Sequence, residues 1–158
     1  MTDHQAQVQP PAGGPLGEEE RAYVALLRTA YQLEWDFAGF LKPHELSPTQ
    51  YNALRILRGA GSPGLPCTQV AERMMNQDSD ITRLMDRLEK RGLVTRERGK
   101  KDRRVICATI SAKGLTLLKN LDGPVSDYVK RRMTVLGGRL GEFAGMLERL
   151  TSVGAQRP

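Results

Sequence analysis

The sequence predicts a mainly α-helical protein with one small β-hairpin, and a single stretch, residues 78–111, carries the main observations. The first half of this stretch places apolar residues at the i, i+3, i+4 and i+7 spacing of one helix face, namely Ile81, Leu84, Met85 and Leu88. Gly92 ends that helix, because glycine adopts the left-handed conformation after a helix at little steric cost. Two short β-rich runs, 93–97 and 105–110, then flank a cationic turn. A short amphipathic helix followed by a basic hairpin is typical of a winged helix-turn-helix.

Composition and charge indicate a soluble globular protein with a polyanionic partner. The chain has 158 residues, of which 39% are hydrophobic and 27% charged, and its formal net charge is +6. Between residues 78 and 104, ten Lys or Arg stand against six Asp or Glu, and the whole excess lies between Arg96 and Arg104. The positive charge is therefore concentrated on the hairpin.

The sequence offers no sign of membrane insertion, secretion or catalysis. No apolar run approaches the roughly 20 residues that span a bilayer, and the N-terminus lacks the features of a secretory signal. Two isolated cysteines fit a reducing compartment, so we expect a cytoplasmic protein. His4 and His44 stand alone, and the sequence has no nucleophile–base set and no glycine-rich phosphate loop. We expect no enzyme activity, no cofactor and no metal site.

The N-terminal part divides into a tail and a helix. Residues 1–17 are rich in Gln, Pro and Gly, which predicts a disordered tail. The acidic run Glu18–Glu20 then opens an amphipathic helix that ends before Pro43, because carboxylates in a first turn complement the helix dipole. We assign residues 18–45 to dimerisation and to part of a ligand pocket.

Residues 46–112 are expected to form the winged helix-turn-helix. Ser47 to Gln50 is a capping box with Pro at the first helical position, which begins a helix. Residues 59–66, rich in Gly and Pro, are predicted to be a turn or loop. A short helix over 67–75 follows, residues 76–77 make the turn, and Asp78 or Ser79 caps the next helix.

Residues 113–153 are expected to form C-terminal dimerisation helices. Ser111 caps the first of them, Pro124 predicts a kink or a short break inside it, and Gly137–Gly138 ends it. The last helix places Leu140, Phe143, Leu147 and Leu150 on one face. These apolar stripes find little to cover them within one chain, which suggests a dimer interface.

The outward face of the helix over 79–91 presents polar groups suited to DNA. Arg83 and Arg87 lie four residues apart, so both reach one major groove, where Arg reads guanine or holds phosphate. Gln77, Ser79 and Thr82 at the helix start suit base edges or phosphate. The alternative is an exposed helix face on which Asp86 and Glu89 pair with the arginines.

The hairpin carries six cations in nine residues, a density that neither a core nor a helix cap explains: Arg96, Arg98, Lys100, Lys101, Arg103 and Arg104. A narrow minor groove favours Arg because it concentrates negative potential. Lys100 and Lys101 are expected to act on phosphate. The alternative is a solvated turn.

These residues also resemble a known family. The segment TRLMDRLEKRGLV (82–94), Asp102–Arg104 and the run 110–114 are similar to the signature of the MarR family of bacterial transcription regulators. The resemblance implies a homodimer of winged helices, intertwined terminal helices and a small-molecule pocket. It also implies that Thr82 and Arg83 belong to the recognition helix, and that Asp102 orients Arg104 for the minor groove. Asp78 and Asp80 depart from the family pattern.

Six of the eight Phe, Tyr and Trp residues lie between positions 23 and 51. Core packing explains such a cluster, but a pocket for a small aromatic anion does so as well, because such pockets combine apolar walls with a few polar groups. The candidate pocket residues are Tyr31, Trp35, His44, Tyr51 and Arg55.

Cys67, near a helix N-terminus, is a second candidate for regulation. A helix N-terminus lowers a thiol pKa and favours redox sensing, while a small buried residue is the alternative for both Cys67 and Cys107.

The sequence thus predicts a homodimeric, ligand-responsive repressor that binds a pseudo-palindromic site on double-stranded DNA. The alternative from another class is a winged-helix module that serves protein assembly or binds structured RNA.

Overall fold

The computed structural model describes residues 16–75, 80–99 and 102–154, so the tail predicted to be disordered lies almost wholly outside the described residues. The chain divides into two compact units, Met1–Tyr51 and Asn52–Pro158, and the boundary falls inside helix α2 (Pro48–Ala60). Within the described ranges, we find no helix with the length and apolar character that a membrane span requires.

The first unit contains the long helix α1 (Glu18–Leu41) and the short 3-10 helix η1 (Lys42–His44). The Glu20 carboxylate accepts a hydrogen bond from the Gly17 N–H at 3.0 Å, which caps the acidic first turn. At the start of α2, the Gln50 N–H donates to Ser47 Oγ and the Ser47 N–H donates to Gln50 Oε1, both at 3.1 Å. The predicted helix before Pro43 and the predicted capping box are both confirmed.

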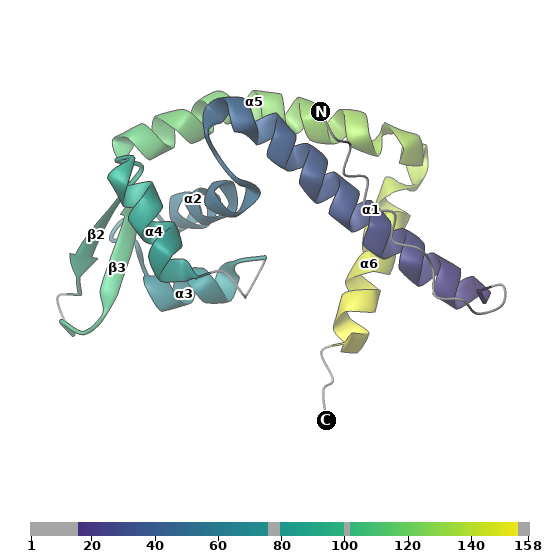
Figure 1. Cartoon of the computed structure of the whole chain (residues 1–158), viewed down its shortest axis with the longest axis horizontal. Helices are drawn as coiled ribbons and strands as arrows, with labels where there is room; N and C mark the ends of the chain where they lie inside the picture. The colour runs from purple at the N-terminus through teal and green to yellow at the C-terminus, as the bar shows by residue number, and fades with distance from the viewer. Residues whose placement is uncertain (1–15, 76–79, 100–101, 155–158) are drawn as a thin grey trace, which may run out of the picture. The chain divides into compact units, whose positions relative to one another are not determined.

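The second unit continues α2 and contains most of the predicted winged helix-turn-helix, as Figure 1 shows. Its further elements are β1 (Leu65–Pro66), α3 (Cys67–Arg73), α4 (Ile81–Lys90), β2 (Val94–Arg98), β3 (Ile106–Ile110), α5 (Ala112–Met133), η2 (Thr134–Arg139) and α6 (Leu140–Gly154). The three strands form one antiparallel sheet in the order β1-β3-β2. A mainly helical chain with a β-hairpin wing is confirmed.

Apolar side chains from four helices form the core of this unit. The inward face of α4 buries Leu84, Met85 and Leu88, as the spacing in the sequence predicted. Fully or almost fully buried residues also come from α2, α3 and α5: Leu54, Leu57, Val70, Leu118 and Leu121. This packing leaves the opposite face of α4 at the surface.

Strand β1 was not predicted, because residues 59–66 were expected to be only turn or loop. Leu65 pairs with Ala108 and Pro66 pairs with Cys107, so this short segment adds a third strand to the hairpin. Gly64 has a φ of +87°, and a Cβ there would overlap the carbonyl oxygen of Ala108. A two-residue strand has no alternation to detect, and the surrounding Gly and Pro residues signal a turn.

The turn after α4 joins this helix to both the sheet and α5. Gly92 has a φ of +69°, its N–H donates to the Glu89 carbonyl at 2.8 Å, and the Leu93 N–H donates to the Leu88 carbonyl at 3.0 Å. Ser111 then bonds this turn twice: its Oγ donates to the Gly92 carbonyl at 2.7 Å, and its N–H donates to the Leu93 carbonyl at 3.0 Å. The predicted helix end at Gly92 is confirmed.

Helix α5 begins at the predicted cap, since Ser111 Oγ accepts a hydrogen bond from the Gly114 N–H at 3.0 Å. Of the kink or short break predicted at Pro124, the break is wrong, because α5 runs as one helix from Ala112 to Met133 with Pro124 inside it, whereas the kink stays a prediction. Non-helical backbone comes later, at Gly137, where φ is +51°. The predicted end at Gly137–Gly138 therefore lies within η2 rather than at the end of α5.

We predict that Gly114→Ala destabilises the fold. A Cβ at Gly114 would overlap the Leu93 carbonyl oxygen and lie 2.8 Å from Ile110 Cγ1, so backbone must move. The expected loss is about 1–3 kcal/mol of unfolding free energy, measured by urea denaturation. Gly59→Ala in α2 is the control, because Gly59 is exposed and nothing lies within 4 Å of its Cβ position, so the substitution should stabilise α2 by up to about 1 kcal/mol. Equal stability of the two variants would contradict the packing at Gly114.

Candidate nucleic-acid interface

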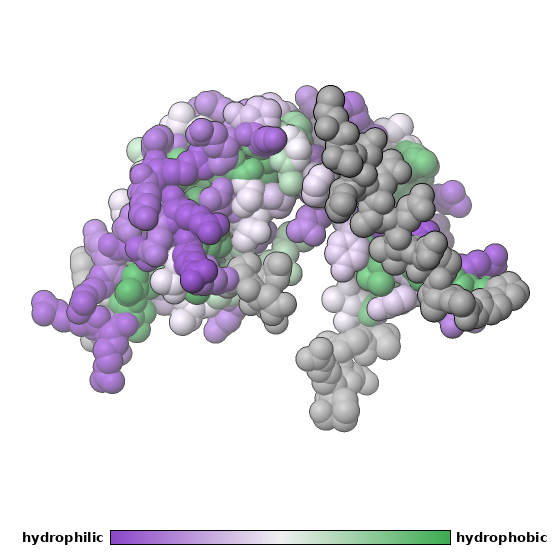
Figure 2. All heavy atoms as spheres, in the orientation of Figure 1, coloured by the Kyte–Doolittle hydropathy of each residue, from purple (hydrophilic) through white to green (hydrophobic). Residues whose placement is uncertain are grey.

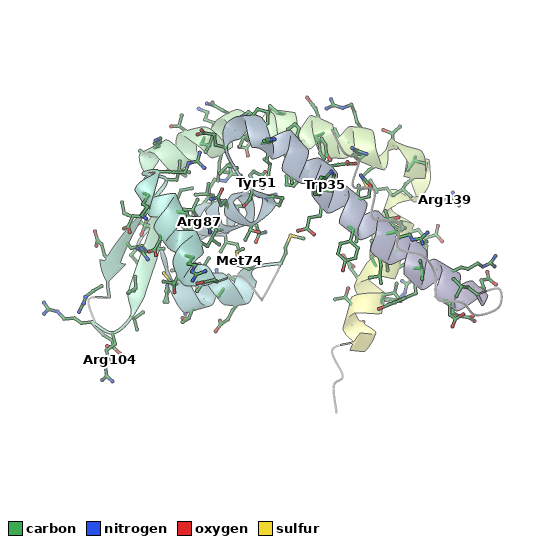
Figure 3. All side chains as sticks on the ribbon, viewed as in Figure 1. Trp35, Tyr51, Met74, Arg87, Arg104 and Arg139 are labelled. Carbon is green, nitrogen blue, oxygen red and sulfur yellow. The ribbon has the colours of Figure 1, made fainter. Side chains whose placement is uncertain are left out.

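The outward face of α4 carries the polar residues that the sequence assigned to a recognition helix. Thr82, Arg83 and Arg87 are all exposed, while the opposite face packs into the core. Figure 3 labels Arg87 on this helix. Gln77 and Ser79, also predicted to contact DNA, lie outside the described residues. The part of α4 that the structure describes thus presents two arginines four residues apart.

The first turn of α4 is capped by Asp80. Its Oδ1 accepts a hydrogen bond from the Arg83 N–H at 3.1 Å, and its Oδ2 lies 3.2 Å from Arg83 Nε. The helix begins at Ile81, so the prediction of a cap at Asp78 or Ser79 is wrong. Three consecutive residues of good capping type made the position ambiguous in the sequence. One of the two carboxylates that depart from the family pattern therefore has a structural role, whereas Asp78 lies outside the described residues.

The wing presents exposed cations at its far end. Arg98, Arg103 and Arg104 are exposed, and the predicted Lys100 and Lys101 lie outside the described residues. The Arg104 side chain is 95% exposed and extends from the end of the hairpin (Figure 3). Figure 2 shows a strongly hydrophilic surface over this hairpin and the neighbouring α4. The cations of the wing are therefore available to a large polyanion.

Asp102 organises the turn that carries Arg104. Its Oδ1 accepts a hydrogen bond from the Arg104 N–H at 2.9 Å and lies 3.7 Å from Arg104 Nε. Its backbone carbonyl accepts from the Val105 N–H at 3.1 Å, which closes the turn into β3. The carboxylate thus fixes the backbone of Arg104 and lies beside the guanidinium, as the resemblance implies.

Arg96 differs from the other cations of the hairpin, because its side chain is only 20% exposed. Its Nε and Nη2 donate to Glu89 Oε2 at 2.9 and 2.7 Å, and Nη2 also donates to Asp86 Oδ1 at 2.5 Å. The hydrogen bond that the Arg96 guanidinium donates to the Glu89 carboxylate is the main cause of a raised pKa for Arg96. The predicted DNA contact of Arg96 stays a prediction, whereas the bonds described here join the wing to α4.

A signal in the sequence pointed to this arrangement. Side chains alternate along a strand, so Arg96 shares a face with Val94, and Val94 is 1% exposed. Cations occur throughout residues 96–104, so the alternation of buried and exposed positions was not recognised for Arg96. Asp86 and Glu89, considered as partners for Arg83 and Arg87, bind Arg96 instead.

The candidate pocket residues occupy different environments. Tyr31 and Trp35 on α1 are 71% and 78% exposed, whereas Tyr51 is 6% exposed. The Tyr51 ring meets Phe37 edge-on at 5.6 Å between centroids, and the His44 ring lies 6.4 Å from that of Phe40. Arg55 is exposed on the part of α2 that belongs to the second unit. The structure therefore brings Tyr51 into aromatic packing and leaves Tyr31 and Trp35 at the surface of α1.

The surroundings of Cys67 disfavour the reactive thiolate. Cys67 is the first residue of α3, as expected, but burial raises the pKa of its thiol above the ordinary value. A raised pKa keeps the sulfur protonated at neutral pH, and the thiolate is the reactive form. Within residues 16–75, 80–99 and 102–154, no three His, Cys, Asp or Glu side chains cluster as metal ligands.

Comparison with known proteins places this geometry in a family. Residues 46–106 match the MarR family. A MarR transcription factor from Planctomyces limnophilus, known from its crystal structure, is 36% identical, with a TM-score of 0.66 over 89% of this chain and 98% of that one. The HTH-type transcriptional regulator MhqR of Bacillus subtilis strain 168 is 28% identical over 64% of this chain and 68% of its own length.

A third relative was solved in complex with DNA. The transcriptional repressor CouR, bound to a 23-mer DNA duplex, is 27% identical, with a TM-score of 0.71 over 89% of this chain and 99% of CouR. These relatives are transcription regulators, and the two solved ones share the fold over 98% and 99% of their length. The chain therefore belongs to the MarR family of winged-helix transcription regulators.

Proposed function

We propose that this protein is a homodimeric, ligand-responsive repressor that binds a pseudo-palindromic site on double-stranded DNA in the bacterial cytoplasm. The observation that carries the proposal is the exposure of two groups of arginines in one compact unit. Arg83 and Arg87 lie on the outward face of α4, and Arg98, Arg103 and Arg104 lie on the wing. The repressor role has the support of CouR, a relative that is a repressor and was solved on DNA.

The two groups suit two different grooves of a duplex. An α-helix fits the major groove, where Arg83 and Arg87 reach guanine edges or phosphates. The wing is a two-stranded ribbon whose exposed tip suits the adjacent minor groove, in which Arg104 meets a concentrated negative potential. Arg98, Arg103, Lys100 and Lys101 then act on phosphate, which sets affinity more than sequence preference.

Dimerisation has the support of apolar side chains that the single chain leaves exposed. On α1 they recur every fourth residue, with exposed fractions of 40% to 78%: Tyr23, Leu27, Tyr31 and Trp35. Near the C-terminus, Val135 is 86% and Leu150 is 61% exposed. Exposed apolar surface of this extent marks an interaction site. A two-fold dimer through residues 18–45 and 113–153 would present two recognition helices to half-sites about one helical turn apart.

Regulation by a small aromatic anion is the last part of the proposal. Tyr31 and Trp35 lie one turn apart on α1, so their rings flank the same strip of helix surface. Large aromatic surfaces with few charges bind flat organic ligands. A ligand at this helix releases DNA if it prefers the conformation of the dimer in which the recognition helices do not match the half-sites.

The DNA-binding proposal predicts selection of a two-fold symmetric sequence. When the protein is mixed with a random duplex library, the bound fraction should become enriched in an inverted repeat with half-sites about 34–36 Å apart. Sedimentation of the complex should give two chains per duplex. Enrichment of no sequence, or tighter binding to a hairpin RNA than to any duplex, would contradict the proposal and favour the alternative winged-helix module.

We predict that Arg104→Ala weakens binding to the selected duplex by about 5- to 150-fold, because it removes the minor-groove contact. Fluorescence anisotropy at fixed salt measures this loss. Arg139→Ala is the matched control, since it removes the same charge from an exposed residue of η2, outside the winged helix (Figure 3). If both variants lose affinity equally, the effect is one of net charge and Arg104 makes no specific contact.

The effector proposal predicts that some phenolic or benzoic acid binds and releases DNA. Trp35 is the single tryptophan of the chain and is 78% exposed, so its emission should change on binding. Calorimetry with a panel of these acids should show heat for the same compounds that release DNA. Release of DNA without heat or thermal stabilisation would point to a different trigger.

A further inference from the structure

Arg96 joins the wing to the recognition helix by both its side chain and its backbone. The guanidinium bonds Asp86 and Glu89 of α4, and the Arg96 N–H donates to Glu89 Oε1 at 3.2 Å. We name this group, Arg96 with Asp86 and Glu89, the Arg96 clamp. Four hydrogen bonds between one strand residue and two helix residues define the separation and the angle of β2 and α4.

We propose that Arg96 is a positioning residue, which holds the wing so that Arg104 reaches the minor groove while α4 lies in the major groove. The inference rests on the proposed DNA-binding function and assigns Arg96 a task different from that of the exposed wing cations. Its side chain is 20% exposed, against 95% for Arg104, so Arg96 has little surface to offer a phosphate.

A clamp is needed at this place because a hairpin alone is not rigid. An isolated two-stranded hairpin is marginally stable in water. Arg96 pairs with Ala108, and Ala108 pairs on its other side with Leu65 of β1, so the clamp holds the base of the hairpin on the β2 side as β1 holds it on the β3 side. Arginine suits the task, since its planar guanidinium forms several hydrogen bonds of fixed direction with carboxylates. Asp86 and Glu89 lie three residues apart and so on the same side of α4.

The single positive charge of Arg96 also offsets one of the two carboxylate charges that Asp86 and Glu89 bring to the helix that is to face DNA. Removing Arg96 alone would therefore weaken binding through charge as well as through position. A clamp-free variant with Arg96→Ala, Asp86→Asn and Glu89→Gln separates the two effects, because it removes the bonds and leaves no uncompensated carboxylate. A positional role predicts that this variant still binds the selected duplex more weakly than the wild type.

A double-mutant cycle tests whether Arg104 needs the Arg96 clamp to contact the minor groove. In the wild type, Arg104→Ala should weaken binding by about 5- to 150-fold. In the clamp-free background the same substitution should cost less than about twofold, because Arg104 no longer meets the groove. Arg87→Ala is the matched comparison: it lies on the helix, so its cost should be the same in both backgrounds. These costs are ratios of dissociation constants at fixed salt.

An equal cost of Arg104→Ala in both backgrounds would overturn the inference, because a merely structural Arg96 would leave the wing contact intact. Circular dichroism first establishes the temperature at which all variants are folded. If the clamp-free variant does not fold, Arg96→Lys replaces it, since lysine keeps the charge but cannot bond both carboxylates through a planar fork. The cost of Arg104→Ala should then be reduced but not abolished. If the proposed DNA-binding function is wrong, the wild type itself selects no duplex from the library. That result is distinct from an unchanged cost of Arg104→Ala, and it overturns the clamp inference as well.

Discussion

The close contact between Gly114 and the Leu93 carbonyl is the constraint on which the arrangement of the second unit depends. It brings the first turn of α5 against the turn that ends the recognition helix. Ser111 bonds the same turn through its hydroxyl and its backbone, and Lys113 Nζ donates to the Arg91 carbonyl at 2.8 Å. The end of α4 is thus joined directly to α5, and any side chain at position 114 would separate them. No flexible segment separates the end of α4 from the start of α5 at this contact.

In the same unit, some arginines form ion pairs between elements of the fold, and others are exposed at the surface. Arg58 bonds Asp122 with both contacts at 2.9 Å, and Arg96 bonds Asp86 and Glu89, so these arginines hold elements together. Among the described residues, the other cations of α4 and of the hairpin are exposed, namely Arg83, Arg87, Lys90, Arg98, Arg103 and Arg104. The net positive charge of a segment therefore overstates the number of residues available to DNA, and the exposed fraction of each side chain corrects the estimate.

The sequence predicted the elements that have strong local signals and missed those set by tertiary contacts. The capping box of Ser47 and Gln50 and the helix end at Gly92 each depend on contacts within a few residues. The sequence therefore predicted both positions correctly. Strand β1 is two residues long and exists only because β3 lies beside it. The partner of Arg96 depends on the packing of β2 on α4, which no local pattern fixes. The break expected at Pro124 did not occur, since the loss of one backbone hydrogen bond does not interrupt a 22-residue helix.

Each edge of the small sheet lacks one backbone donor that a further strand would need. Strand β1 at one edge has two residues, and one of them is proline, which has no N–H to donate. At the other edge, the N–H of Arg96 in β2 is already bonded to Glu89. Arg96, which joins the wing to α4, thus has a backbone N–H that is no longer available to pair with a strand of another chain. A cationic hairpin of this kind can therefore extend into solvent with a reduced tendency to pair with strands of other chains.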